Sequence, residues 1–190
     1  MIGWKWSLFL LLLTGAYSAP AQPPQKRPKL TVALLKRTPD RDLEDLVYHT
    51  ALSRTDGQPS EFKAISKLPQ GIRMVFSTML FEGEVNNGGF HQFFWNSSGQ
   101  YAQEALSGLT LIGAKHDAKL LAKAIGIYKQ EQARIEKIKA KKGDFMKLYQ
   151  EAEKSSKLGT LDDEFYKHGD NLSWLRVKYI RAHPEKFVER

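Results

Sequence analysis

Apolar residues recur at intervals of three and four along most of the chain after residue 38, which is the spacing of helices that bury one face. The clearest segments are residues 40–51, 69–84, 101–112, 117–128, 145–152 and 172–180. No stretch of any length alternates apolar and polar residues as a half-exposed strand does. The pattern therefore predicts an all-α fold, a single-domain irregular bundle of about seven to nine helices.

Capping residues predict where several of these helices begin and end. Thr38 before Pro39, Ser60 and Asp144 are expected N-caps, and Thr160 to Asp163 resembles a capping box with Asp in place of Glu. The helix that begins near Pro69 is expected to end at Asn86-Asn87-Gly88-Gly89, because glycine and asparagine tolerate the left-handed conformation of a C-cap. A second short helix is expected from Phe90 to Trp95.

The first 37 residues follow a different pattern, typical of an export signal. Lys5 precedes the apolar run 7–13, and small residues at 16, 18, 19 and 21 predict a signal peptide over residues 1–21, cleaved after Ser18 or Ala21. The run is shorter than the roughly 20 residues of a spanning helix, so no stable membrane insertion is expected after cleavage. An N-terminal helix of the mature fold is the alternative.

A Pro-rich, basic linker and a short apolar arm are expected over residues 22–37, before an all-helical domain over residues 38–188. The apolar arm itself, Leu30 to Leu35, leaves open a short strand or a docked segment. The protein is thus predicted to be exported, and periplasmic or secreted.

Charge and composition narrow the classes of partner. The chain has 29 Lys and Arg against 21 Asp and Glu, a net charge of +8, and no cysteine, which excludes disulfides and thiolate chemistry. The densest basic run is Lys137 to Lys142, yet residues 74–114 contain no Lys or Arg. Surfaces that bind single-stranded nucleic acid interleave aromatic and basic residues, and here the two are separated, which argues against nucleic acid.

One segment, Glu82 to Ser98, combines polar amides, glycines and a dense aromatic block. The aromatic residues, expected to form a structural core, are Phe90, Phe93, Phe94 and Trp95. The candidate binding residues are Glu84, Asn86, Asn87, Gly88, Gly89, His91, Gln92 and Asn96. A rigid corner between helices and a binding site are compatible interpretations, since a corner supports a site well.

The chemistry in this segment is sparse. Glu84 near a helix C-terminus opposes the helix dipole, so a nearby donor is expected, from the amides of Gly88 and Gly89 or the side chain of Asn86 or Gln92. His91 is interpreted as an exposed or capping residue rather than a general acid or base. The five histidines form no His-x-x-x-His pair, so neither a metal nor a cofactor is expected, and no catalytic residue is assigned.

The segment Glu84 to Asn96, with its Asn-Gly-Gly-Phe-x-Gln-Phe-Phe core, resembles the signature of a bacterial family of uncharacterised helical domains named after an acidic DNA-mimic protein. The resemblance extends through Tyr101 to Ala124 and the ending Tyr179 to Phe187. It implies an all-helical domain and, for the family's founder, a dimer that occupies a repressor's DNA-binding surface. DNA mimicry needs a dense array of carboxylates in place of phosphates, which this basic chain lacks.

The leading hypothesis from the sequence is an exported protein–protein interaction module, with an unknown protein partner and a homodimer left open. It would use the surface from Asn86 to Asn96. The alternative is a small periplasmic hydrolase or ligand-binding protein that uses Glu84, His91, Gln92 and Asn96.

Overall fold

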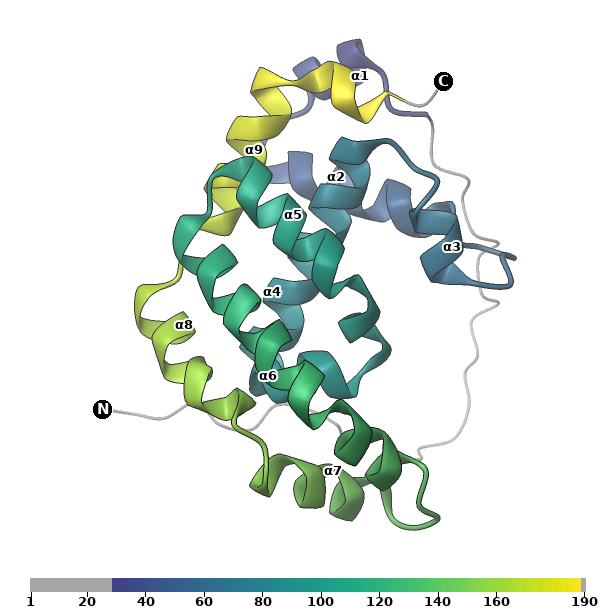
Figure 1. Cartoon of the computed structure of the whole chain (residues 1–190). Helices are drawn as coiled ribbons and strands as arrows, with labels where there is room; N and C mark the ends of the chain where they lie inside the picture. Colours follow the sequence, from purple (N-terminus) through teal and green to yellow (C-terminus); the bar gives the residue numbers. More distant parts are fainter. Residues whose placement is uncertain (1–28, 189–190) are drawn as a thin grey trace, which may run out of the picture.

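The computed structural model describes residues 29–188, and the predicted signal peptide lies outside them. This part of the chain forms nine α-helices and three 3-10 helices and has no β-strand, which confirms the all-α prediction (Figure 1). The helices are α1 (Val32–Arg37), α2 (Asp40–Ser53), α3 (Glu61–Ile65), α4 (Gln70–Trp95), α5 (Ala102–Ile112), α6 (Lys115–Lys139), α7 (Phe145–Lys154), α8 (Asp162–His168) and α9 (Leu172–Ala182), with η1 (Ser97–Tyr101), η2 (Leu158–Leu161) and η3 (Pro184–Phe187).

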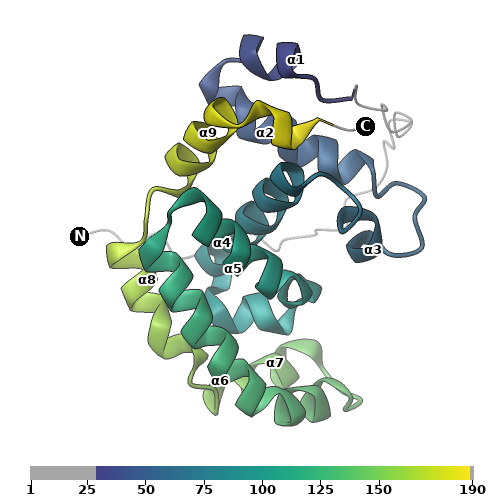
Figure 2. The same cartoon turned by 45° about the horizontal axis from the view of Figure 1, so that its top comes forward.

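Helix α4 is the axis of the fold. It packs against α2, α5 and η1, and further along against η2, α8 and η3. Figure 1 shows α5 and α6 lying over α4, with α1 and α9 at one end of the molecule and α7 at the other; Figure 2 shows the same order after rotation. The helix that carries the candidate segment is therefore the most central element.

The core around α4 is rich in aromatic rings. Phe81 lies 5.8 Å from Phe90, 5.4 Å from Phe93 and 5.7 Å from Phe165, measured between ring centroids. Phe90 and Phe93 are fully buried. A smaller cluster joins Trp95 to residues of α6 and α7, namely Ile135, Ile138 and Ala152. The aromatic block of the signature is thus core, as the sequence predicts.

Helix α4 is broken at two glycines. Gly88 (φ −161°, ψ 29°) and Gly89 (φ 74°, ψ −178°) leave helical geometry, so residues 70–87 and 90–95 form two helical segments that meet at a kink. A positive φ with ψ near 180° is a conformation that only glycine adopts readily. The predicted end of the first helix at this tetrapeptide is correct, although the second segment follows it directly.

Helix α8 supports both sides of the break. The Phe90 amide, at the start of the second segment, donates to Asp162 Oδ1 at 2.9 Å. The Tyr166 hydroxyl donates to the Val85 carbonyl, in the last turn before the break, at 2.7 Å. Backbone groups freed by a helix break need such partners when they are buried. One turn of α8 therefore satisfies the end of one segment and the start of the other.

Two of the predicted caps are wrong, and both residues bind elsewhere. Thr38 does not cap α2; its hydroxyl donates to the Leu34 carbonyl at the end of α1. Thr160 forms no capping box at α8, because its hydroxyl donates to the Lys157 carbonyl and Asp163, the acid of the expected box, pairs with Lys167. The caps by Ser60 and Asp144 are confirmed.

The apolar arm before residue 38 is a helix. Thr31 caps α1 by accepting a hydrogen bond from the Leu34 amide at 3.1 Å, and Leu30 and Leu35 are buried. Helix α1 packs against α9 and η3. The strand alternative is therefore wrong, because the Thr31 cap and the burial of one helical face favour a helix here.

A buried arginine ties three helices together. Arg176 of α9 is 2% exposed and contacts Glu44 of α2 at 2.7 Å and Glu82 of α4 at 2.6 Å. The sequence pattern gave no indication of this pairing, because its members are up to 132 residues apart.

Candidate functional site

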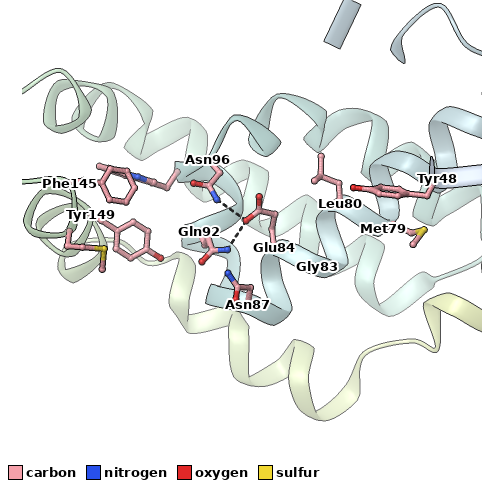
Figure 3. A pocket seen from close by; sticks show the side chains of 12 residues that line it. Tyr48, Met79, Leu80, Gly83, Glu84, Asn87, Gln92, Asn96, Phe145 and Tyr149 are labelled. Atoms are coloured by element: carbon pink, nitrogen blue, oxygen red, sulfur yellow. Dashed lines mark hydrogen bonds between the residues drawn. The ribbon is translucent and has the colours of Figure 1, made fainter. Parts of the chain in front are cut away.

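A cavity of about 900 Å³ opens beside the break in α4. Its lining residues come from α2, both segments of α4, the residue that follows α4, and α7: Tyr48, Met79, Leu80, Gly83, Glu84, Asn87, Gln92, Trp95, Asn96, Phe145, Met146 and Tyr149. Figure 3 shows Tyr48 and Met79 at one end, Phe145 and Tyr149 at the other, and the polar side chains between them. The cavity therefore has two apolar ends and a polar middle.

The polar middle is organised by Glu84. Its Oε2 accepts hydrogen bonds from Gln92 Nε2 at 2.7 Å and from Asn96 Nδ2 at 2.9 Å, and its Oε1 accepts one from Ser98 Oγ at 2.5 Å. The carboxylate lies on the first segment of α4, while Gln92 lies on the second and Asn96 directly follows it (Figure 3). The kink at Gly88 and Gly89 is what brings the donors to the acid, since a straight helix would direct them elsewhere.

The bonds to Glu84 also fix the orientation of both amides. Because the nitrogen of each amide faces the carboxylate, each carbonyl oxygen is left as an acceptor. The Gln92 oxygen lies against Gly88, where an added Cβ would be 2.2 Å from it, so the missing side chain of Gly88 makes room for this arrangement. The polar middle thus offers acceptors and a negative charge.

The two tyrosines at the ends of the cavity both have raised pKa values. Burial raises the pKa of Tyr48, and the charges of Glu61 and Glu84 raise it further. Burial also raises the pKa of Tyr149, followed by the charges of Glu153, Asp162 and Glu84. Both phenols stay protonated at neutral pH, and every resolved charge that acts on them is negative.

His91 lies apart from this cluster. It is 2% exposed, and its ring packs edge-on against Tyr149 with 4.9 Å between ring centroids. Burial lowers the pKa of His91 to about 4, so the ring is neutral. The expectation of an exposed or capping histidine is wrong, because the kink turns this residue into the space between α4 and α7.

The structure divides the sequence-predicted site residues into two groups. It brings Glu84, Asn87, Gln92 and Asn96 to the cavity. Asn86 is exposed and lines a separate cavity of about 220 Å³ beside α8, Gly89 is buried, and His91 does not line the larger cavity. Of the donors that the sequence predicts for Glu84, Gln92 bonds the carboxylate, whereas Asn86 and the backbone amides of Gly88 and Gly89 do not.

The sequence did not predict several residues that contribute to the site. Phe145 and Tyr149 follow the helical period of α7 and read as core, yet Phe145 is 60% exposed at the edge of the cavity. Ser98 does not line the cavity, but its hydroxyl donates to Glu84; the sequence could not show this bond, because it spans the kink and the turn after α4. Met146, which is 54% exposed, lies outside the apolar face that the period predicts.

Within residues 29–188, no group of three His, Cys, Asp or Glu side chains is arranged to hold a metal ion. None of the helices in that range combines the length and apolar character that a membrane crossing requires.

A sequence model for the family described as "DMP19-like protein" matches residues 66–183. The chain belongs to this family. The matched region includes the whole of α4, the cluster at Glu84 and the α7 wall of the cavity, whereas Tyr48 and the first three helices precede it. No curated protein matches the chain. Family membership accounts for the helical domain and leaves its role open.

Proposed function

We propose that the protein is an exported, non-catalytic interaction module that binds an apolar segment of a partner protein in the cavity beside Glu84. The observation that carries the proposal is the composition of the cavity: two apolar ends, one of them exposed at Phe145 and Met146, around a carboxylate held by three donors. Large exposed apolar side chains around a concave site are typical of protein-binding surfaces.

The same geometry gives no support to a hydrolase. General base catalysis needs a titratable group within reach of the attacking nucleophile. Glu84 already accepts three hydrogen bonds, and His91 is neutral, buried and outside the cavity lining. DNA mimicry is not proposed either, since the chain carries a net charge of +8.

Site-specific photo-crosslinking tests the proposal. Phe145 is replaced by the photoreactive analogue p-benzoylphenylalanine in cells that produce the protein, and Trp174 serves as the matched control, since it is also an exposed aromatic residue (56%) but does not line the cavity. A discrete protein adduct is expected from position 145 and not from position 174. No discrete adduct, or the same adduct from both positions, contradicts a partner at this cavity; an adduct between two copies of the chain would make the module a homodimer.

Export has a separate test. The pattern of small residues predicts cleavage after Ser18 or Ala21. N-terminal sequencing of the protein recovered from cells should therefore begin at Ala19 or Gln22, and a chain that keeps residues 1–21 would contradict export by this route.

A further inference from the structure

The polar middle of the cavity accepts hydrogen bonds and donates few. Gln92 and Asn96 each donate one N–H to Glu84, so each amide keeps its carbonyl oxygen and one further N–H. A carboxylate has about four lone-pair sites, and three are used, so Oε1 of Glu84 keeps one for a ligand. The charge of Glu84 favours a ligand group that donates and is positive, and it disfavours an anion.

Charge points in the same direction. Glu84 is the only residue with an acidic or basic side chain, other than the two tyrosines, among those that line the cavity. Residues 74–114, which include every residue of α4 that lines the cavity, contain no Lys or Arg. Lys139 lies over Trp95 at 5.4 Å from the ring, but it is bonded to Glu136 and lines a different cavity. A positive group would therefore be attracted despite the basic charge of the chain as a whole.

The walls suit a cation with apolar neighbours. The rings of Tyr48, Phe145 and Tyr149 lie on both sides of the acidic middle (Figure 3), and Trp95 is a further aromatic lining residue. Aromatic faces attract cations as well as apolar groups. Met79 and Leu80 extend the apolar surface at the Tyr48 end, and Met146 extends it at the Phe145 end. The order along the cavity is apolar, acidic, apolar.

On the basis of the proposed function, we infer that the partner segment carries a lysine or arginine flanked on both sides by large apolar residues, with the cationic group bound at Glu84. The flanking side chains fill the Tyr48 and Phe145 ends. The cationic group donates to the open lone pair of Glu84 and to the Asn96 oxygen.

The test compares three peptides by fluorescence anisotropy on the full mature protein: acetyl-LFKFL-amide, and the same peptide with the lysine replaced by norleucine or by glutamate. The lysine peptide is expected to bind about tenfold more tightly than the norleucine peptide, with the glutamate peptide weakest. The advantage of lysine should shrink at high salt, because a partly exposed ion pair is screened.

Two variants assign the preference to Glu84. Glu84→Gln should abolish the difference between the lysine and norleucine peptides, and Glu185→Gln, which removes one exposed carboxylate on η3, should preserve it. Equal or tighter binding of the norleucine or glutamate peptide, no binding of any peptide, or a lysine preference that survives Glu84→Gln overturns the inference. If Glu84→Gln does not fold, the three peptides on the unmodified protein decide alone.

The two proposals fail differently. A protein adduct at position 145 without a lysine preference removes only the inferred ligand class. Absence of both the adduct and the peptide binding removes the interaction at this cavity as well.

Discussion

Replacing Gly89 by alanine tests the role assigned to the break in α4. The residue has φ 74° and ψ −178°, and a Cβ built on it would lie 2.3 Å from Oδ2 and 2.7 Å from Cγ of Asp162. The methyl group therefore meets both an unfavourable backbone conformation and the carboxylate that accepts from the Phe90 amide. The first effect costs about 1–3 kcal/mol, because this region of φ and ψ is nearly restricted to glycine.

The second effect adds the loss of a helix cap. If the Asp162 carboxylate moves aside, the Phe90 amide at the start of the second segment loses its partner, which costs about 1 kcal/mol. Together the two effects lower the free energy of unfolding by about 3 kcal/mol, a large share of the 5–15 kcal/mol that is usual for a domain. The Gly89→Ala variant is expected to fold, and to unfold at a clearly lower urea concentration than the unmodified protein.

Urea denaturation followed by circular dichroism measures the change. Gly126→Ala is the matched control, because Gly126 is exposed within α6 and a Cβ there meets nothing within 4 Å. Gly126→Ala should instead raise the free energy of unfolding by about 0.5–1 kcal/mol, since alanine favours the helix.

A double variant separates the two causes. With Asp162→Ala already in place, Gly89→Ala no longer meets a carboxylate, so its cost should fall by about 1 kcal/mol relative to the unmodified protein. If Gly89→Ala is as well tolerated as Gly126→Ala, or if the two changes simply add, the account of the break is wrong.

Three further predictions concern buried side chains that can carry a charge. Burial lowers the pKa of His91 to about 4, so as the pH falls below about 6.5 the unfolded chain takes up a proton that the native state does not. The unmodified protein should therefore lose about 1–3 kcal/mol of its free energy of unfolding on acidification towards pH 4, and His91→Phe should not show this loss. Burial and then the charge of Asp170 raise the pKa of Asp117 to about 6, so the native state holds the carboxyl proton more tightly than the unfolded chain does. The free energy of unfolding should therefore decrease as the pH rises from about 4 to 6, and Asp117→Asn should not show this decrease. Arg176→Met leaves Glu44 and Glu82 without their cation and should cost about 2–4 kcal/mol, measured by thermal unfolding.

Each of these has a result that would contradict it. A urea midpoint that changes with pH in His91→Phe or in Asp117→Asn as it does in the unmodified protein would show that another group titrates. For Arg176, the companion variant with Glu44→Gln and Glu82→Gln should recover part of the loss, and no recovery would mean that packing of the long side chain, rather than its charge, is what matters.

The helical fold could be predicted from the sequence because its signal is local. Apolar spacing within each helix depends only on neighbouring residues, and the glycine pair at 88 and 89 marks the break in α4 by its backbone freedom. The aromatic block could be placed in the core for the same reason.

The site could be predicted only in part, because its geometry depends on distant segments. Gln92 lies close enough in sequence to Glu84 to be proposed as its donor, but Phe145 and Tyr149 reach the cavity from α7, more than 50 residues away. The exposure of His91 was predicted wrongly, since local polarity suggests solvent while the kink directs the ring towards Tyr149. The capping box predicted at Thr160 is absent because η2 runs directly into α8 and the Thr160 hydroxyl donates to the Lys157 carbonyl.

The support of the break by α8 has a consequence for the order of folding. The signature is contiguous in the sequence, but the two side chains that bond its backbone come much later. Asp162 follows Phe90 by 72 residues, and Tyr166 follows Val85 by 81 residues. A ribosome-bound chain that has just emerged through Trp95 therefore has both helical segments without the residues that stabilise the angle between them. Closing such a long loop is slow relative to forming helices, so the cavity takes its shape late, after α5, α6 and α7 are already available.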